Sequence, residues 1–366
     1  MADTYAIRYP RRIVVRAILV LIGRVLIRLL ARPHVTGLEN LPRKGPVILV
    51  GNHVAMIEVV LMALYAPWQV EFIGTGDIPV DPRFAWLVKL WGIIPVNRGS
   101  TDRREMAVPL DVLRQGGVVG IFPEGGIWST SLKRARTGVA WLSFHANAPV
   151  LPIGFGGMRG ALQAVFALKR PRLTMNVGQL MPPVSGRMDG KSRKESLEAA
   201  ANAIMAEVTA LIPEEEKRSW NRITDERFDF EFIVHTANGS DGIPKPVIHR
   251  DGLGRFFHVP VILDVMARNM HLPVQPLQRL DSDPRVIADA AGVALSFFDS
   301  HPHFLSYRFG YEQAAEIYAG VVELRELARA AAAEGQAITL RPVRQYRSTE
   351  TGEQVIETTP GAMHEM

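Results

Sequence analysis

Short apolar runs along the chain alternate with longer segments in which apolar residues recur every three or four positions. The runs predict strands near residues 47–50, 70–73, 93–96, 118–122, 150–153 and 173–177, and the longer segments predict helices near 55–65, 83–91, 102–115, 132–146 and 192–211. Strands that alternate with helices are typical of an α/β fold with a mostly parallel central sheet flanked by helices. Pro109 lies inside one helical segment, where we expect a kink or a late start of the helix.

The pattern changes beyond a charged stretch at residues 213–219, which marks a domain boundary. The later part of the chain is mainly helical in pattern, with Ala-rich helices around 284–299 and 311–334 and a short strand at 337–341. Three regions are therefore expected: an amphipathic membrane-interface helix within 1–34, an α/β domain over 35–222, and a mainly helical C-terminal region over 223–366, whose role the sequence does not indicate.

The N-terminal helical segment is strongly apolar but is interrupted by Arg16, Arg24 and Arg28. Its longest uncharged run has seven residues, from Ala17 to Gly23, whereas a spanning helix needs about 20. A helix lying in the membrane interface fits this pattern, with arginine stems that extend to anionic headgroups. A helix packed on the core with a solvated face is the alternative. We expect a peripheral, monotopic membrane protein on the cytoplasmic face.

Charge and cysteine content narrow the function classes. Residues 1–34 hold seven arginines and one acidic residue, a net charge of +6, which leaves −1 for the rest of a chain whose total is +5. Nucleic-acid binders usually spread basic residues and aromatics across a domain, so no nucleic-acid partner is expected. The chain has no cysteine, which excludes disulfides, cysteine metal sites and a covalent acyl-cysteine intermediate.

A histidine and a carboxylate follow the first predicted strand of the α/β domain. The strand stops at Gly51 and Asn52, His53 lies in the turn, and Glu58 comes five residues later. Two such positions on one continuous helix point about 140° apart and do not pair. If His53 lies in the turn and Glu58 in the first helical turn, the carboxylate can orient the imidazole as a general base for a hydroxyl. The alternative is a structural histidine.

Three further segments follow in order, and the four together resemble the glycerolipid acyltransferase family. The family, which includes 1-acylglycerol-3-phosphate acyltransferases, shares a His-x4-Asp block, an arginine-bearing block, a Phe-Pro-Glu-Gly block and a proline-bearing strand. Here the second, third and fourth blocks lie at 93–99, 118–126 and 148–154, and the resemblance covers roughly residues 35–215.

Two positions depart from the family pattern. The acid is Glu58 where the family usually has Asp, which is one methylene shorter. The third block continues with Gly126, Ile127 and Trp128, where the family typically has Thr, Arg and Ser. The missing arginine weakens the case for a phosphate on the acceptor, because a guanidinium fork is the usual phosphate clamp.

The resemblance assigns further site residues. Arg98 matches the arginine that binds the acceptor phosphate, and Glu124 matches the glutamate that helps bind glycerol hydroxyls, although it can also cap the next helix. Gly125 and Gly126 allow close backbone approach and offer N–H groups to an anion. The residues expected to shape the site are Asn52, Pro123 and Pro152.

Three cations follow the third block. Lys133, Arg134 and Arg136 either replace the missing arginine, meet the phosphates of the acyl donor, or form a solvated basic face.

The resemblance implies an O-acyltransferase that acts on membrane lipids. His53 takes the proton of an acceptor hydroxyl as that oxygen attacks the thioester of acyl-CoA or acyl-carrier protein, and the default acceptor is 1-acylglycerol 3-phosphate, giving phosphatidic acid. Alternatives are a different lysolipid or glycolipid acceptor, a non-catalytic lipid-binding scaffold, and a thioester hydrolase. We expect no metal and no cofactor, and the oligomeric state is not determined by the sequence.

Overall fold

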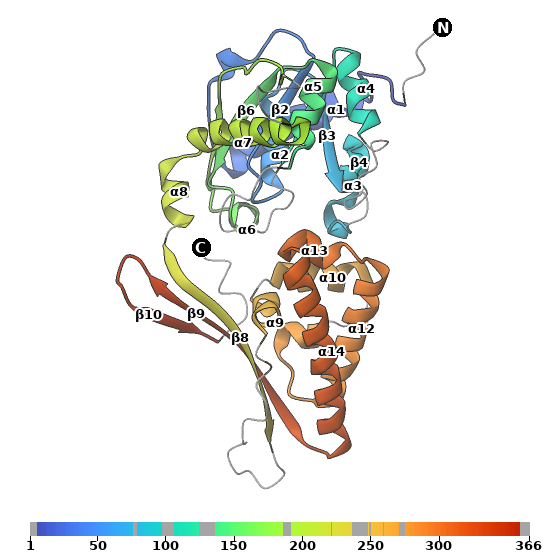
Figure 1. Ribbon diagram of the computed structural model, residues 1–366, viewed down its shortest axis with the longest axis vertical. Helices are drawn as coiled ribbons and strands as arrows, with labels where there is room; N and C mark the ends of the chain where they lie inside the picture. The colour runs from blue at the N-terminus through green and yellow to red at the C-terminus, as the bar shows by residue number, and fades with distance from the viewer. Residues whose placement is uncertain are drawn as a thin grey trace. The chain divides into compact units, whose positions relative to one another are not determined.

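The computed structural model describes residues 6–75, 79–96, 106–123, 136–185, 192–220, 222–235, 248, 250–258, 260–270 and 275–358. The chain divides into two compact units (Figure 1). The first consists of Met1–Gly76 and Trp86–Trp220, and the second of Asp77–Ala85 and Asn221–Met366. The second unit therefore takes in a short segment that the sequence pattern places in the first domain.

A seven-stranded sheet forms the centre of the first unit. Its strands are β1 (Arg32–Thr36), β2 (Val47–Gly51), β3 (Val70–Thr75), β4 (Ile94–Val96), β5 (Val118–Ile121), β6 (Val150–Gly156) and β7 (Arg172–Val177). They lie in the order β1-β7-β6-β2-β5-β3-β4. Every neighbouring pair is parallel except β6 and β7, which are antiparallel. The predicted α/β fold with a mostly parallel sheet is confirmed, and β1 is a strand that the apolar pattern does not predict.

Helices cover both faces of this sheet. They are α1 (Ile13–Leu30), α2 (Ile57–Tyr65), α3 (Pro82–Trp91), α4 (Ala107–Arg114), α5 (Gly138–Ala146), α6 (Ala161–Phe166), α7 (Arg193–Leu211) and α8 (Glu214–Trp220), with a 3-10 turn at Leu38–Asn40. Helix α4 begins only two residues before Pro109, so the late start is confirmed; a proline is tolerated in the first turn because its missing N–H would have no partner there.

Strand β2 shows how the two faces are filled. All five of its residues are buried, and successive side chains point to opposite faces. Val47 and Leu49 pack in a cluster with residues of α1, α2 and α6, whereas Ile48 and Val50 pack with α4, α5 and α7. Helix α7 lies across the strands of its face (Figure 1). Helices α1, α2 and α6 therefore share one face of the sheet, and α4, α5 and α7 share the other.

A buried ion pair holds α1 on the sheet. Arg16 and Glu71 are both fully buried, and the two guanidinium Nη atoms lie 2.7 and 2.9 Å from the two carboxylate oxygens. Arg16 also donates to the carbonyl of Trp91, and Arg11 reaches Glu71 at 2.8 Å. Burial, together with the charge of Glu71, raises the pKa of Tyr9. Glu71, the second residue of β3, therefore forms ion pairs with two of the N-terminal arginines.

Two more of the N-terminal arginines donate to backbone carbonyls. Arg24 donates to the carbonyl of Leu64 at 2.6 Å, and Arg12 donates to the carbonyls of Lys89 and Leu90. The prediction that the arginine stems extend to lipid headgroups is wrong for Arg16, which is fully buried. The physical reason is that Glu71 and the carbonyl of Trp91 bind its guanidinium group within the fold.

The outer face of α1 is apolar. Val14 is 72% exposed and Leu21 is 67% exposed. The exposed apolar residues of the helix are Ile13, Val14, Val15, Ile18, Leu21, Ile22, Val25, Leu26 and Leu29. On a helix that packs on a soluble domain the exposed face is normally polar, so the usual arrangement is inverted. Within the part of the chain that the structure describes, no helix combines the length and apolar character needed to cross a membrane.

The second unit contains an antiparallel sheet in addition to helices. Its strands are β8 (Ile223–His235), β9 (Ala337–Ser348) and β10 (Gln354–Glu357), in the order β10-β9-β8. Its helices are α9 (Asp251–Phe257), α10 (Pro260–Met270), α11 (Gln275–Arg279), α12 (Pro284–Ser300), α13 (Phe304–Phe309) and α14 (Tyr311–Ala333). In β8, buried Phe228, Phe230, Phe232 and Val234 alternate with less buried residues. The interpretation of this region as mainly helical misses β8 and most of β9.

We predict that Glu71→Gln lowers the free energy of unfolding by about 3–5 kcal/mol, because it leaves buried Arg16 without its counter-charge. The double variant Arg16→Met/Glu71→Leu should recover much of this loss, since an apolar pair of similar volume carries no unpaired charge. Denaturant unfolding followed by circular dichroism measures both. A change of less than about 0.5 kcal/mol in Glu71→Gln, the size of an ordinary surface substitution, would show that the pair does not hold α1 in place.

Candidate active site

The turn after β2 is held at the end of the sheet by Asn52. Its side chain donates to the carbonyl of Phe155 at 3.2 Å and accepts from the N–H of Phe155 at 2.8 Å. Asn52 is fully buried, so both bonds form away from water. Gly51 precedes it where a Cβ would come within 2.6 Å of the Phe155 ring. A side chain at position 51 would therefore collide with the Phe155 ring. Asn52 then fixes the turn to the neighbouring strand β6.

His53 lies in this turn with its imidazole partly covered. Its side chain is 12% exposed, and the ring stacks on Phe122 at 4.3 Å between centroids with an interplanar angle of 23°. Nδ1 lies 3.7 Å from Oε2 of Glu58. This is an ion-pair distance and is longer than a hydrogen bond. The structure thus brings together the two residues that the placement of turn and helix predicts to meet.

Glu58 has a second role at the start of α2. Its buried carboxylate accepts from the N–H of Val54 at 2.8 Å and from the N–H of Ala55 at 2.9 and 3.1 Å. Met56, the N-cap residue, provides no side-chain cap. The first N–H groups around a helix start need acceptors, and a negative charge is favoured there by the helix dipole. One carboxylate therefore holds the His53 turn in shape and places a negative charge behind the imidazole.

Two prolines and one arginine of the predicted site also lie at this edge of the sheet. Pro123 is buried directly after β5, and its carbonyl accepts from the backbone N–H of Arg136 at 3.1 Å. Pro152 is buried in β6 opposite Val50 of β2. Because β2 and β5 are parallel neighbours, Arg136 begins its segment at the same edge as His53. Arg136 is exposed to solvent.

The remaining predicted site residues lie outside the described residues: Arg98, Glu124, Gly125, Gly126, Lys133 and Arg134. Their roles stay predictions.

Arg159 is a further cation that the block pattern does not indicate. It follows β6, the strand next to β2, whose C-terminal end lies at the same edge of the sheet as the turn of His53. Burial lowers the pKa of its guanidinium below the ordinary arginine value, and the charge of Glu216 opposes this shift. The sequence could have indicated Arg159, because it is an arginine just past the end of a buried strand, where sheets of this kind bind ligands.

Taken together, the edge carries a stacked imidazole, a carboxylate behind it and arginines nearby. A carboxylate near one imidazole nitrogen stabilises the protonated ring, so that the other nitrogen can accept a proton from a hydroxyl. Among the described residues, no group of three or more histidine or acidic side chains is placed to hold a metal ion.

The family comparison agrees with this chemistry. Residues 32–156 match the family model described as Acyltransferase. This match and the relatives described below support a PlsC-like glycerolipid acyltransferase with O-acyltransferase activity. The matched segment begins at β1 and ends at β6, so it contains His53 and Glu58.

Individual relatives resemble between about a quarter and a half of the chain. The 1-acyl-sn-glycerol-3-phosphate acyltransferase of Streptococcus pneumoniae is 25% identical over 191 residues, which cover 51% of this chain and 68% of that protein. The 1-acyl-sn-glycerol-3-phosphate acyltransferase of Bacillus subtilis is 20% identical over 187 residues, covering 50% and 92%. The lyso-ornithine lipid O-acyltransferase of Pseudomonas aeruginosa is 33% identical over 85 residues, covering 23% and 32%.

Among solved structures, that of the 1-acyl-sn-glycerophosphate acyltransferase PlsC from Thermotoga maritima covers 53% of this chain and 80% of its own, with 18% identity and a TM-score of 0.39.

Proposed function

We propose that this protein transfers a fatty acyl group from acyl-CoA or acyl-carrier protein to a hydroxyl of a lysolipid, with His53 as the general base. The observation that carries the proposal is the position of His53. It stacks on Phe122 and lies 3.7 Å from the Glu58 carboxylate, inside the segment that matches the acyltransferase family. A base placed in this way suits a reaction in which a hydroxyl must lose its proton as it attacks.

The proposed reaction proceeds without a covalent enzyme intermediate. The acceptor oxygen attacks the thioester carbonyl carbon while its proton passes to Nε2 of His53, because Nδ1 is the nitrogen that faces Glu58. The carbon–sulfur bond of the tetrahedral intermediate then breaks, and the leaving thiolate takes the proton back from the imidazolium. Glu58 stabilises the imidazolium between these steps. Backbone amides of Gly125 and Gly126 are the proposed donors to the oxyanion.

The default acceptor is 1-acylglycerol 3-phosphate, which gives phosphatidic acid. Two of the relatives are named for this substrate. Arg98, with Glu124 for the glycerol hydroxyls, is the proposed binding group for the acceptor phosphate. Arg136 and Arg159 are further cations at this edge of the sheet and suit a phosphate on either substrate.

A phosphate-free lysolipid is the second candidate acceptor. Ile127 replaces the arginine that the family usually has in the third block, so one phosphate-binding group is missing. A relative named as a lyso-ornithine lipid O-acyltransferase shares 33% identity over 85 residues. Both observations favour an acceptor that the protein can bind with fewer positively charged side chains.

The proposed location is the cytoplasmic face of a membrane, with α1 lying in the interface. The outer face of α1 is apolar and exposed, while its early arginines are bonded inside the fold. The apolar face of such a helix enters the boundary between headgroups and acyl chains to a depth of about 5–10 Å. Membrane attachment by this helix is therefore chiefly hydrophobic.

For catalysis, we predict that His53→Ala lowers turnover by about 10²–10⁴-fold with little change in stability, since general-base contributions have this size. Glu58→Gln should lose most of the rate and also some stability, because its carboxylate accepts from the N–H groups of Val54 and Ala55 in the turn before α2. Glu58→Asp should keep a substantial fraction of both. Release of CoA from acyl-CoA in the presence of a lysolipid panel measures turnover. Near-wild-type turnover in His53→Ala would remove the mechanism, and CoA release without any acceptor would indicate a hydrolase.

For the acceptor, we predict that Arg98→Ala raises the KM for 1-acylglycerol 3-phosphate by about 10–100-fold, as expected for loss of one charge-assisted hydrogen bond. The KM for the acyl donor should hardly change. A monoacylglycerol without the phosphate is the matched control substrate, and its KM should be the same in both proteins. An equal rise for both acceptors would contradict a phosphate contact of Arg98 and direct the search to Arg136 and Arg159.

For the membrane, we predict that Leu21→Ser/Val25→Ser on the outer face of α1 lowers vesicle binding about tenfold or more, through lost apolar burial. The matched control is Tyr311→Ser/Ile356→Ser, a pair that is similarly exposed in the second unit. Wild-type binding to neutral vesicles should persist at high salt, because it depends on burial of the apolar face of α1. Co-sedimentation with vesicles measures both effects. Wild-type binding by the α1 variant would contradict the anchor.

A further inference from the structure

The turn that follows α6 exposes two large apolar side chains. Phe166 is 67% exposed and Leu168 is 72% exposed, as much as Leu21 and Val14, the two most exposed apolar residues of α1. Helix α6 packs on the same face of the sheet as α1 and α2, through Ala161 and Val165. We refer to residues 166–170 as the α6 turn. Its apolar side chains are therefore presented to solvent on the side of the domain that carries α1.

Leu168 takes a strained backbone conformation in the α6 turn. The N–H of Leu168 bonds the carbonyl of Val165 at 3.0 Å, and the N–H of Lys169 bonds the carbonyl of Ala164 at 2.9 Å. This is the pattern of a helix end whose final residue adopts the left-handed conformation, and glycine usually takes that position. Leu168 has φ +56° there, where a side chain is strained.

Other helices of the same chain end differently. The residues with positive φ after α3, α4 and α14 are Gly92, Gly116 and Gly335, and the one after α5 is Asn147. A second leucine with positive φ, Leu280 after α11, packs against the apolar core of the second unit. Leu168 has the same strained, positive φ as Leu280, but its side chain is exposed and does not pack on an apolar core. An apolar medium outside the protein would supply that cover.

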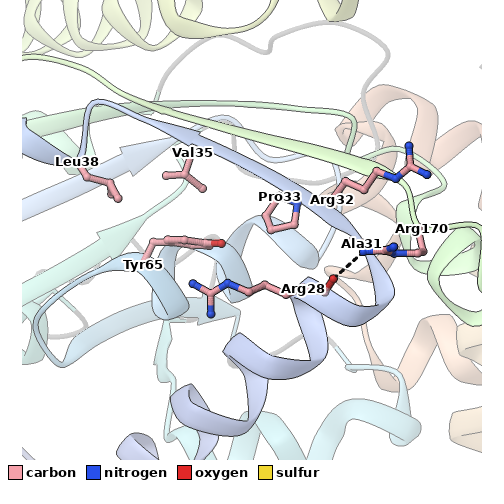
Figure 2. A pocket seen from close by; sticks show the side chains of 8 residues that line it. All are labelled: Arg28, Ala31, Arg32, Pro33, Val35, Leu38, Tyr65 and Arg170. Atoms are coloured by element: carbon pink, nitrogen blue, oxygen red, sulfur yellow. Dashed lines mark hydrogen bonds between the residues drawn. The ribbon is translucent and has the colours of Figure 1, made fainter.

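Basic residues complete the α6 turn and connect it to α1. Lys169 and Arg170 follow Leu168, and Nη2 of Arg170 donates to the carbonyl of Arg28 at 3.0 Å. Arg28, Arg32 and Arg170 line an open groove with a volume of about 500 Å³ (Figure 2). The side chain of Arg28 extends along the groove towards Tyr65, while Arg32 and Arg170 lie at its other end.

No acid balances these cations within the described residues. None of the groove-lining side chains is acidic, and in the part of the chain that the structure describes no carboxylate forms an ion pair with Arg28, Arg32 or Arg170. They differ in this from Arg11 and Arg16, which share Glu71. Cations beside exposed apolar side chains match the chemistry of an anionic bilayer surface, where phosphates lie directly above acyl chains.

We propose that the α6 turn is a second membrane contact, in which Phe166 and Leu168 enter an anionic bilayer and Lys169, Arg28 and Arg32 meet its phosphates. The proposal rests on the membrane location of the proposed function and adds a separate attachment point. A single interfacial helix can roll about its own axis. A second apolar contact, connected to α1 through Arg170 and Arg28, stops that rotation and sets one face of the domain against the lipid.

The test measures flotation of the full-length protein with vesicles of neutral phosphatidylcholine, alone or mixed with anionic phosphatidylglycerol, and needs no turnover. Phe166→Ser/Leu168→Ser should lower binding to both kinds of vesicle by about tenfold or more. Tyr311→Ser/Ile356→Ser is the apolar control. Arg32→Gln/Lys169→Gln should lower binding to anionic vesicles by about fivefold per charge and leave neutral vesicles nearly unchanged.

The charge control is Arg193→Gln/Lys194→Gln, an exposed adjacent basic pair on α7, which covers the opposite face of the sheet. It should leave the preference for anionic vesicles unchanged.

Leu168→Gly separates a membrane role from a folding role. Glycine relieves the strain at φ +56°, so the midpoint of thermal unfolding should stay or rise while vesicle binding falls. A fall in both would assign Leu168 to packing and overturn the proposal. Wild-type binding by both the serine and the glycine variants would also overturn it, and the α1 anchor and the chemistry of His53 would stand unaffected.

Discussion

The ion pair between Arg16 and Glu71 decides which way the first helix faces. Glu71 is fully buried in β3 and needs a partner, because an unpaired charge in the interior is very unfavourable. Two arginines meet it, and the helix that carries Arg16 must turn its charged stripe inward. The apolar stripe then has no protein to cover it. The surface chemistry of this face of the domain thus follows from one buried acid, and the lipid attachment that we propose depends on it.

The candidate site is built on a turn that is fastened at two points. Asn52 ties the turn to β6 through paired hydrogen bonds, and Glu58 ties it to the start of α2 through the N–H groups of Val54 and Ala55. His53 lies between these two attachments, with one ring face on Phe122. Few side-chain positions remain open to the imidazole as a result. For the general base that we propose, orientation before substrate binding reduces the entropy lost on reaching the reactive geometry.

Much of the α/β domain is predictable from the sequence, because its central strands are continuous apolar runs and its helices repeat every three to four residues. Strand β1 escapes this pattern since its edge position allows Arg32 and His34. Strand β8 escapes it because acidic residues separate Phe228, Phe230 and Phe232, so that no apolar run forms. The closeness of His53 and Glu58 follows from local geometry. The inward direction of Arg16 does not, because its partner is 55 residues away along the chain, and neither does Arg159, which no block of the family pattern includes.

Only Ala31 separates the end of α1 from the start of β1. A hinge is made of a few residues whose backbone angles change, and the single buried residue Ala31 leaves no such segment between α1 and β1. Strand β1 joins the central sheet through β7 and β6, which borders β2. In the membrane attachment that we propose, the depth of α1 in the bilayer therefore sets the height of the His53 edge of the sheet above the acyl chains. The acceptor would then be selected by the level of its hydroxyl above the lipid tails, so that headgroups of different chemistry can share one site if their hydroxyl lies at the same level.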